Sequence, residues 1–177
     1  MIFQFRIISD ENKEFARELL IDSSQTFLDF HHVLQENLGY DPSQLSSFFI
    51  TNERWEKSTQ ITLIDMMDEE SDNMLIMEGT VLGDHIEELG QRLLYVFDFF
   101  SERSFFIELT EVIEKLESKA LPKITFEHGD PPPQIDLGIG DLEIPADDFS
   151  ADTDYGLGDD ELSEGFEFRD GDDFPAE

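Results

Sequence analysis

Apolar side chains and negative charge are divided unevenly along this chain, and that division limits where a folded core can form. Of the seventeen phenylalanines, thirteen precede Glu127. From residue 127 to residue 177 there are eighteen Asp and Glu residues against one base, Arg169. A segment with so much like charge and so little apolar surface does not recover the conformational entropy that folding costs. We therefore expect a folded domain over residues 1–126 and a disordered acidic tail over residues 127–177.

The formal net charge of −32 favours some classes of partner over others. Direct binding to nucleic acid needs a patch of basic side chains that displaces counterions, and the Lys and Arg residues of this chain are scattered. The same charge disfavours anionic membrane surfaces and attracts basic proteins. The sequence therefore predicts a basic protein as partner, no direct nucleic-acid binding and no membrane binding, and it leaves the oligomeric state open.

The sequence lacks the motifs of several classes of enzyme and metal site. The absence of cysteine excludes disulfides, thiolate catalysis and zinc–sulfur sites. Neither a phosphate-binding loop nor a nucleophile elbow is present. Residues 152–164 are similar to a calcium loop, but the glycine and the bidentate glutamate are misplaced. We therefore predict no cofactor and no metal ion.

The location in the cell follows from two further patterns. Residues 1–10 lack the basic start and the apolar run of a signal peptide. The longest apolar runs are far shorter than the roughly 20 residues that a membrane helix needs. We expect a cytoplasmic protein.

Hydrophobic periodicity predicts one clear helix and several strands within residues 1–126. The helix runs from Phe27 to Leu38, where apolar residues recur every three or four positions. Thr26 can cap its start, and Gly39 can supply the left-handed residue that ends it. Strands are predicted over residues 2–9, 45–52, 61–66 and 74–77, with one helical turn around residues 83–87. Residues 14–23 fit either a helix or a strand, and their local propensity favours helix.

Two alternating runs near residue 100 predict an antiparallel hairpin. In residues 92–100 and again in residues 105–110, large apolar side chains alternate between two faces. A short polar turn at residues 101–103 joins the two runs. Prolines at position 122 and at positions 131–133 then mark the end of the predicted domain.

Several of these segments, in this order, resemble the plasmid pRiA4b ORF-3-like family. The family helix has the form T-L-x-x-L-H-x-V-I-Q-x-x-F-G-W, and Thr26–Tyr40 reads TFLDFHHVLQENLGY. Leu82–Asp84 matches a short L-x-D element, and Tyr95–Thr110 matches a longer motif that begins Y-x-Y-D-F. The resemblance covers about residues 1–135. The matching motif positions singled out are Thr26, His31, Phe48, Tyr95, Asp98 and Phe99.

This resemblance implies a fold, and it implies no activity because the role of the family is not established. The family begins with a pair of strands, so residues 14–23 are expected to form a strand. The implied fold class is α+β, a mostly antiparallel sheet with a helix packed on one face. Polar positions of the family motif are small or apolar here, around Ser104 and Phe105. The chain therefore looks like a divergent member that has kept the scaffold.

Two residues are candidate catalytic groups, each with a structural alternative. Asp98 stands between two phenylalanines, where burial would raise its pKa and suit a general acid or base. We favour the other interpretation, in which Asp98 accepts hydrogen bonds from backbone N–H groups of the adjacent turn. His31 lies in the apolar stripe of the helix and is more typical of a packed histidine than of a metal ligand. The enzyme hypothesis, a small metal-dependent or acid–base enzyme, pairs Asp98 with His31 or His85.

Aromatic residues recur among the acids of the tail and are candidates for binding a partner. They include Phe149, Tyr155, Phe166 and Phe168. An acidic segment of this kind can order on a basic partner, or it can remain solvated chain. We favour a protein-interaction module without enzymatic activity, whose acidic tail binds a basic protein. A third hypothesis is self-association through an edge strand or the Phe-rich hairpin.

Overall fold

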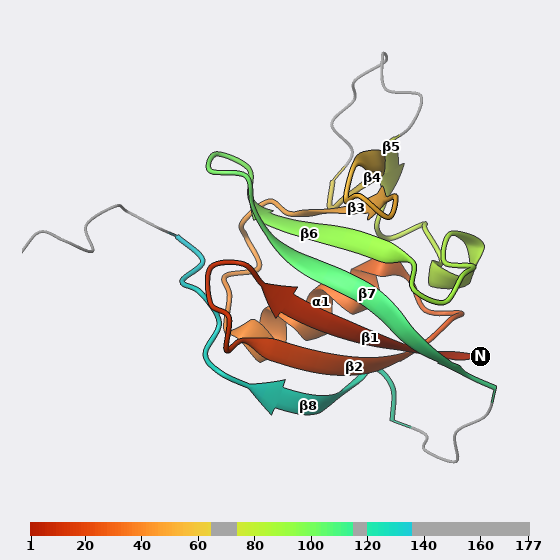
Figure 1. Cartoon of the computed structure of the whole chain (residues 1–177). Helices are drawn as coiled ribbons and strands as arrows, with labels where there is room; N and C mark the ends of the chain where they lie inside the picture. Colours follow the sequence, from red (N-terminus) through yellow and green to blue (C-terminus); the bar gives the residue numbers. More distant parts are fainter. Residues whose placement is uncertain (65–73, 115–119, 136–177) are drawn as a thin grey trace, which may run out of the picture. The chain divides into compact units, whose positions relative to one another are not determined.

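The computed structural model describes residues 1–64, 74–114 and 120–135, and they form a single sheet with one helix against it (Figure 1). The eight strands lie in the order β5-β4-β3-β6-β7-β1-β2-β8. All neighbouring strands pair antiparallel except β4 and β5, which pair parallel. The elements are β1 Ile2–Ser9, β2 Ala16–Asp22, α1 Phe27–Leu38, β3 Ser47–Thr51, β4 Lys57–Thr62, β5 Met74–Ile76, the 3-10 turn η1 Leu82–Asp84, β6 Arg92–Asp98, β7 Arg103–Ile113 and β8 Lys123–His128. The expected α+β fold class is confirmed.

Helix α1 begins and ends as its sequence predicts. The Thr26 hydroxyl accepts a hydrogen bond from the Asp29 N–H at 3.2 Å, and the Asp29 carboxylate accepts one from the Thr26 N–H at 2.9 Å. This reciprocal pair is a capping box, which satisfies two N–H groups that the helix leaves free. Gly39 ends the helix with φ of +67°, a conformation that glycine adopts without strain. Among the described residues, no helix is long and apolar enough to cross a membrane.

The core lies between α1 and the face of the sheet that the helix covers. Phe30 of the helix stacks on Phe5 of β1, with ring centroids 5.0 Å apart. Phe30 also packs on Phe48 of β3 at 5.0 Å, and Phe48 packs on Tyr95 of β6 at 4.7 Å. All four rings are fully buried. Aromatic contacts of this kind join the helix to three strands that are far apart in sequence.

Most of the predicted strands are confirmed, with shifts at their ends. Residues 14–23 contain β2, as the family resemblance implied and the local propensity did not. The expected hairpin is the antiparallel pair β6 and β7. The strand expected over residues 61–66 lies earlier, at β4, because Ile61 must stand opposite Phe48 for both side chains to reach the core. The helical turn expected around residues 83–87 is η1.

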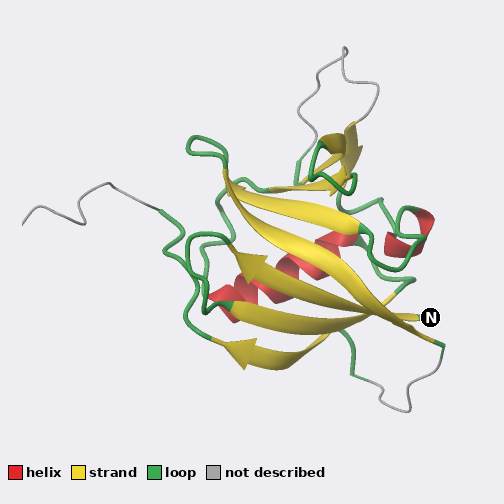
Figure 2. Ribbon diagram, in the orientation of Figure 1, coloured by secondary structure: helices red, strands yellow, loops and turns green. Residues whose placement is uncertain are grey.

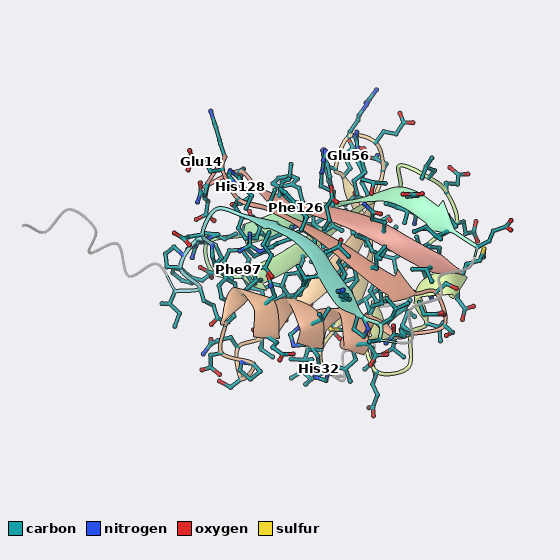
Figure 3. The ribbon with its side chains drawn as sticks, turned by 90° about the horizontal axis from the view of Figure 1, so that it is seen from below. Glu14, His32, Glu56, Phe97, Phe126 and His128 are labelled. Carbon is teal, nitrogen blue, oxygen red and sulfur yellow. The ribbon has the colours of Figure 1, made fainter. Side chains whose placement is uncertain are left out.

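Strand β8 was not predicted, and the expected domain boundary after residue 126 falls inside it. Its sequence, KITFEH, has only two apolar residues, and none of its side chains is buried. Its position comes from backbone pairing with β2. Phe126 and His128, labelled in Figure 3, lie on the face of β8 turned away from the helix. The sheet therefore continues to His128.

The prolines after β8 also pack on the folded part of the chain. Although proline has no N–H, its carbonyl still accepts hydrogen bonds. Tyr40 Oη donates to the Pro132 carbonyl at 2.6 Å, and Arg103 Nη2 donates to the Pro133 carbonyl at 2.7 Å. Gln134 Oε1 accepts from the Asp41 N–H at 2.6 Å. Residues 127–135 thus belong to the folded part, and residues 136–177 of the expected tail lie outside the described residues.

Candidate functional site

His31 and Tyr95, two residues of the family motif, meet in a buried polar cluster beneath α1. His31 Nδ1 lies 2.8 Å from Tyr95 Oη and 3.2 Å from Ser46 Oγ. Gln35, one turn along the helix, donates from Nε2 to Tyr95 Oη at 2.6 Å. All four residues are at most 3% exposed. Sequence analysis singled out His31 and Tyr95 but missed Gln35, although Gln35 matches the glutamine of the family helix motif. It also missed Ser46, which lies in the loop before β3 and carries no motif signal.

The electrostatics of this cluster favour neutral groups. Burial, with a smaller contribution from the charge of neighbouring His32, lowers the pKa of His31 to about 4. Burial likewise raises the pKa of Tyr95 to about 12. Tyr95 has one proton, which it can donate either to His31 or to Ser46 at 3.2 Å. The cluster is closed to solvent, so it orders the core and offers no surface to a substrate.

Asp98 stabilises the β6–β7 turn. Its Oδ1 accepts hydrogen bonds from the N–H groups of Phe100 at 2.9 Å and Ser101 at 3.2 Å. Its Oδ2 lies 3.9 Å from Arg103 Nη1, so the carboxylate also faces a cation. Asp98 thus makes the backbone hydrogen bonds expected under the structural interpretation, which sequence analysis favoured over a catalytic role.

Arg103, which sequence analysis placed only at the end of a turn, joins several segments at this end of the sheet. It donates to both carboxylate oxygens of Glu11, at 2.9 Å and 2.7 Å. Hydrogen bonding to Glu11 raises the pKa of Arg103, so the guanidinium stays charged. It also donates to the carbonyls of Pro133 and Gln134. Arg103 thereby ties the chain after β8 to the start of β7.

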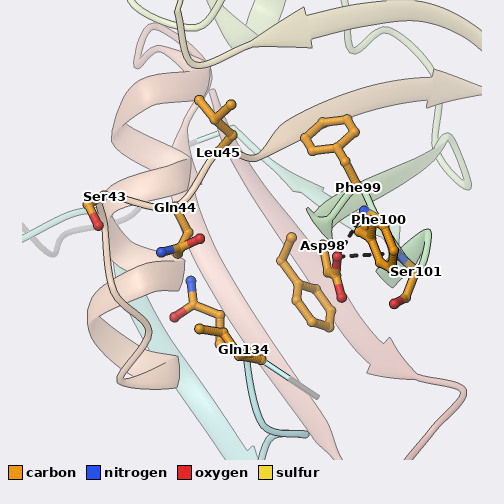
Figure 4. Close-up of a pocket in the computed structure, with 10 residues that line it drawn as sticks. Ser43, Gln44, Leu45, Asp98, Phe99, Phe100, Ser101 and Gln134 are labelled. Carbon is orange, nitrogen blue, oxygen red and sulfur yellow. Dashed lines mark hydrogen bonds between the residues drawn. The ribbon is translucent and has the colours of Figure 1, made fainter. Parts of the chain in front are cut away.

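A surface pocket of about 440 Å³ lies beside this turn (Figure 4). Its walls come from the loop after α1, the β6–β7 turn and the last described residues: Ser43, Gln44, Leu45, Phe97, Asp98, Phe99, Phe100, Ser101, Gln134 and Ile135. Four of these are apolar yet exposed: Leu45 at 45%, Phe99 at 40%, Phe100 at 99% and Ile135 at 58%. Two amides, two hydroxyls and the Asp98 carboxylate supply the polar side-chain groups. The pocket therefore suits an apolar side chain flanked by hydrogen-bonding groups.

The histidines of the enzyme hypothesis lie elsewhere. His85 lines a second, more polar pocket of about 410 Å³, together with Glu87, Glu88 and Arg92. His31 is buried in the cluster described above. Figure 3 shows His32 on the side of α1 away from the sheet. Within residues 1–64, 74–114 and 120–135, no three His, Asp or Glu side chains gather as a metal site would require.

The remaining predicted site residues divide between structural roles and the undescribed tail. Thr26 caps α1, and Phe48 packs in the core. Phe99 lines the surface pocket. The tail aromatics Phe149, Tyr155, Phe166 and Phe168, and the segment compared with a calcium loop, lie outside the described residues.

Comparison with known proteins agrees with this fold. A family model for plasmid pRiA4b ORF-3-like protein matches residues 1–142. A crystal structure of a protein of unknown function from Methanosarcina mazei Go1 superposes with a TM-score of 0.59 at 18% sequence identity, over 71% of this chain and 68% of that one. At that identity the likeness concerns the fold alone. A search of curated proteins found no match.

Proposed function

We propose that this chain, which belongs to the plasmid pRiA4b ORF-3-like family, is a cytoplasmic protein-interaction module that binds a basic partner protein. The pocket beside the β6–β7 turn receives an apolar side chain of that partner. The acidic residues that follow attract the basic residues around it. The exposed apolar rim of the pocket is the observation that carries this proposal.

The rim is unusual for a free surface. Phe100, at the tip of the turn, is 99% exposed, and Leu45 and Ile135 bring apolar surface from two other segments. Scattered exposed apolar residues need no explanation, but a cluster around a concave site is typical of a binding surface. Asp98 accepts hydrogen bonds from the N–H groups of Phe100 and Ser101, so this part of the rim lies on an ordered turn. An ordered rim loses little conformational entropy on binding.

The charge of the chain supports a basic partner. Beyond Ile135, the last residue of the pocket lining, residues 136–177 contain sixteen Asp and Glu residues and one Arg. Opposite charge on a partner raises the rate of encounter, and apolar contact in the pocket then slows dissociation. Phe149, Tyr155, Phe166 and Phe168 are the residues of this segment that we propose make apolar contacts once a partner is bound.

A pair of basic peptides tests the proposal. The two peptides carry the same number of Lys and Arg residues. In the apolar peptide, Leu and Phe separate the basic residues. In the control peptide, Ser replaces each Leu and Phe. We expect the full chain to bind the apolar peptide at least tenfold more tightly in fluorescence anisotropy. Phe100→Ser should abolish that preference, whereas Leu89→Ser, an exposed apolar residue of the second pocket, should retain it.

The contribution of the acidic segment is tested separately. A chain ending at residue 138 keeps every described residue, and we expect it to bind both peptides less tightly and with a weaker dependence on salt. Equal affinity of the full chain for the two peptides, or an unchanged preference in Phe100→Ser, would overturn the pocket as the binding site. An unchanged salt dependence after truncation would overturn the role of the acidic segment.

A further inference from the structure

The face of the sheet opposite α1 carries a row of alternating charges. In Figure 2 the helix lies behind the sheet, and the strands β6, β7, β1 and β2 turn their other face towards the viewer. The strand register places Arg92 of β6 opposite Glu108 of β7, then Arg6 of β1, then Glu18 of β2. Arg92 pairs with Glu108 at 3.2 Å, and Arg6 pairs with Glu18 at 3.3 Å. From β6 to β2 the signs are positive, negative, positive and negative.

An apolar row runs beside the charged one on the same face. Two residues further along each strand, the register joins Phe49, Leu94, Phe106, Ile8 and Ala16, from β3 to β2. Ile8 is 42% exposed. Trp55, from the β3–β4 turn, packs edge-on against Phe106 at 4.9 Å, and the Arg92 guanidinium lies 4.9 Å from the Trp55 ring. The half of the face formed by β6 and β7 therefore carries large side chains, whereas the β1–β2 half is flatter, with Ala16.

We propose that this face binds the same face of a second copy of the chain, around a two-fold axis that runs parallel to the strands between β1 and β7. Such an axis places β7 over β1 and β6 over β2 of the other copy. Glu108 then faces Arg6 of the second copy, and Arg92 faces Glu18, each twice because the axis repeats the contact. Two sheets packed in this way keep their strands within about 30° of each other.

The apolar rows also meet under the same operation. Phe106 and the neighbouring Trp55 face the region of Ile8 and Ala16 in the second copy, so the larger side chains of one half meet the flatter half. A two-fold axis along the charged row instead would place each Arg opposite the same Arg. The order of charges therefore selects one orientation, and a partner of uniform charge would meet repulsion from one half of the row.

The decisive experiment exchanges charges between two variants. Arg6→Glu places Glu opposite Glu108 in a dimer of like chains, and Glu108→Arg places Arg opposite Arg6. We expect the full-length protein to sediment as a dimer at tens of micromolar and each variant alone to be a monomer at that concentration. In an equimolar mixture every one of these contacts pairs Glu with Arg, so the mixture should sediment as a dimer again.

Controls separate this interface from charge and folding effects. Glu36→Arg makes the same change in net charge as Glu108→Arg, but it lies on the exposed side of α1, and it should remain a dimer. A cooperative thermal unfolding transition in each variant would show that it is folded. A wild-type chain that sediments as a monomer at every concentration would overturn the proposal, as would a mixture of the two variants that stays monomeric.

Because the chain has no cysteine, single cysteines give a second measurement. An oxidised mixture of Arg6→Cys and Glu108→Cys should form a disulfide between the two different chains. A mixture of Arg6→Cys with Glu36→Cys should form no such disulfide, because Glu36 lies outside the proposed interface. Equal cross-linking in the two mixtures would overturn the proposed axis.

Discussion

At the scale of single residues, the polar and aromatic positions that match the family motif serve mainly the interior of the fold. His31 and Tyr95 hydrogen-bond beneath the helix, and Phe48 packs on the Tyr95 ring. Asp98 accepts from the backbone of its own turn. The sequence placed each of these side chains on the right element. It could not show that His31 and Tyr95 touch, because 64 residues separate them and only the packing of α1 on β6 brings them together.

The Tyr95 hydroxyl is expected to matter more than an ordinary hydrogen-bonding group. Tyr95→Phe removes a group that contacts His31, Gln35 and Ser46, and leaves their polar atoms buried without that partner. We expect the free energy of unfolding to fall by about 1–3 kcal/mol in urea denaturation. Tyr40→Phe, which removes a hydroxyl with one hydrogen bond, should cost less. Equal losses in the two variants would show that the cluster is not cooperative.

The low pKa of His31 predicts how stability depends on pH. In the unfolded chain a histidine has a pKa of about 6.5, so between that value and about 4 the unfolded state binds the proton more readily than the folded state. Stability should therefore fall as pH decreases from 6.5 to 4, with His31 contributing up to about 3 kcal/mol of the loss.

The variant His31→Gln cannot titrate, and its stability should depend less steeply on pH in that interval. The measurement is urea denaturation at a series of pH values. His32→Gln removes a histidine on the exposed side of α1, and it should leave most of the dependence in place. An identical slope for the wild type and His31→Gln would contradict the assignment.

At the scale of elements, strand pairing overrides local helix propensity where the two favour different structures. Residues 14–23 could form a helix by propensity, but they form β2 because the alternation of Phe15, Leu19 and Ile21 presents buried side chains to α1. Strand β8 shows the other limit of sequence analysis. It has almost no buried side chain, and its hydrogen bonds with the edge of β2 place it in the sheet.

Three glycines are expected to respond differently to substitution by alanine. At Gly129, φ is +64° and an added Cβ would lie 2.6 Å from the Glu14 carbonyl oxygen, so both strain and a clash with backbone result. At Gly39, φ is +67° but no atom lies within 4 Å, so strain alone should cost about 1–2 kcal/mol. At Gly79, φ is not positive and no atom lies within 4 Å of an added Cβ, so neither strain nor a clash is expected.

We therefore expect the loss of melting temperature to decrease in the order Gly129→Ala, Gly39→Ala, Gly79→Ala, with little or no loss for the last. Thermal unfolding followed by circular dichroism measures it. A Gly129→Ala variant as stable as Gly79→Ala would mean that Gly129 does not lie against the backbone of Glu14, in the segment that leads into β2.

At the scale of the whole molecule, the chain after β8 ties the end of the described residues back to their beginning. Asn12 donates from Nδ2 to the Asp130 carbonyl at 2.8 Å, and Arg103 bridges Glu11 and the Pro133 carbonyl. The bond from Asn12 joins positions 118 residues apart, and the bond between Arg103 and Glu11 joins positions 92 residues apart. The boundary of the folded domain is therefore set by these contacts as well as by composition.

Two truncations test that connection. A chain that ends at residue 130 loses the carbonyl acceptors of Tyr40 and Arg103, and it should be less stable than the full chain by about 1–3 kcal/mol. A chain that ends at residue 138 keeps those acceptors and should unfold at the temperature of the full chain. The same melting temperature for both truncations would contradict a structural role for residues 131–135.

The sequence by itself determined the helix with both of its ends, the β6–β7 hairpin and the separation of an apolar front from an acidic end, whereas the α+β class was implied by the family resemblance. Each of the first three depends on short-range periodicity, on a capping residue or on composition, all of which are local. Only the tertiary structure decided that β2 and β8 are neighbours, that His31 meets Tyr95, and that residues 127–135 belong to the fold. It also aligned four strands so that Arg and Glu alternate across one face. The physical reason is that these contacts join residues far apart in the chain, and their energy arises only once strand register and helix packing have brought the groups together.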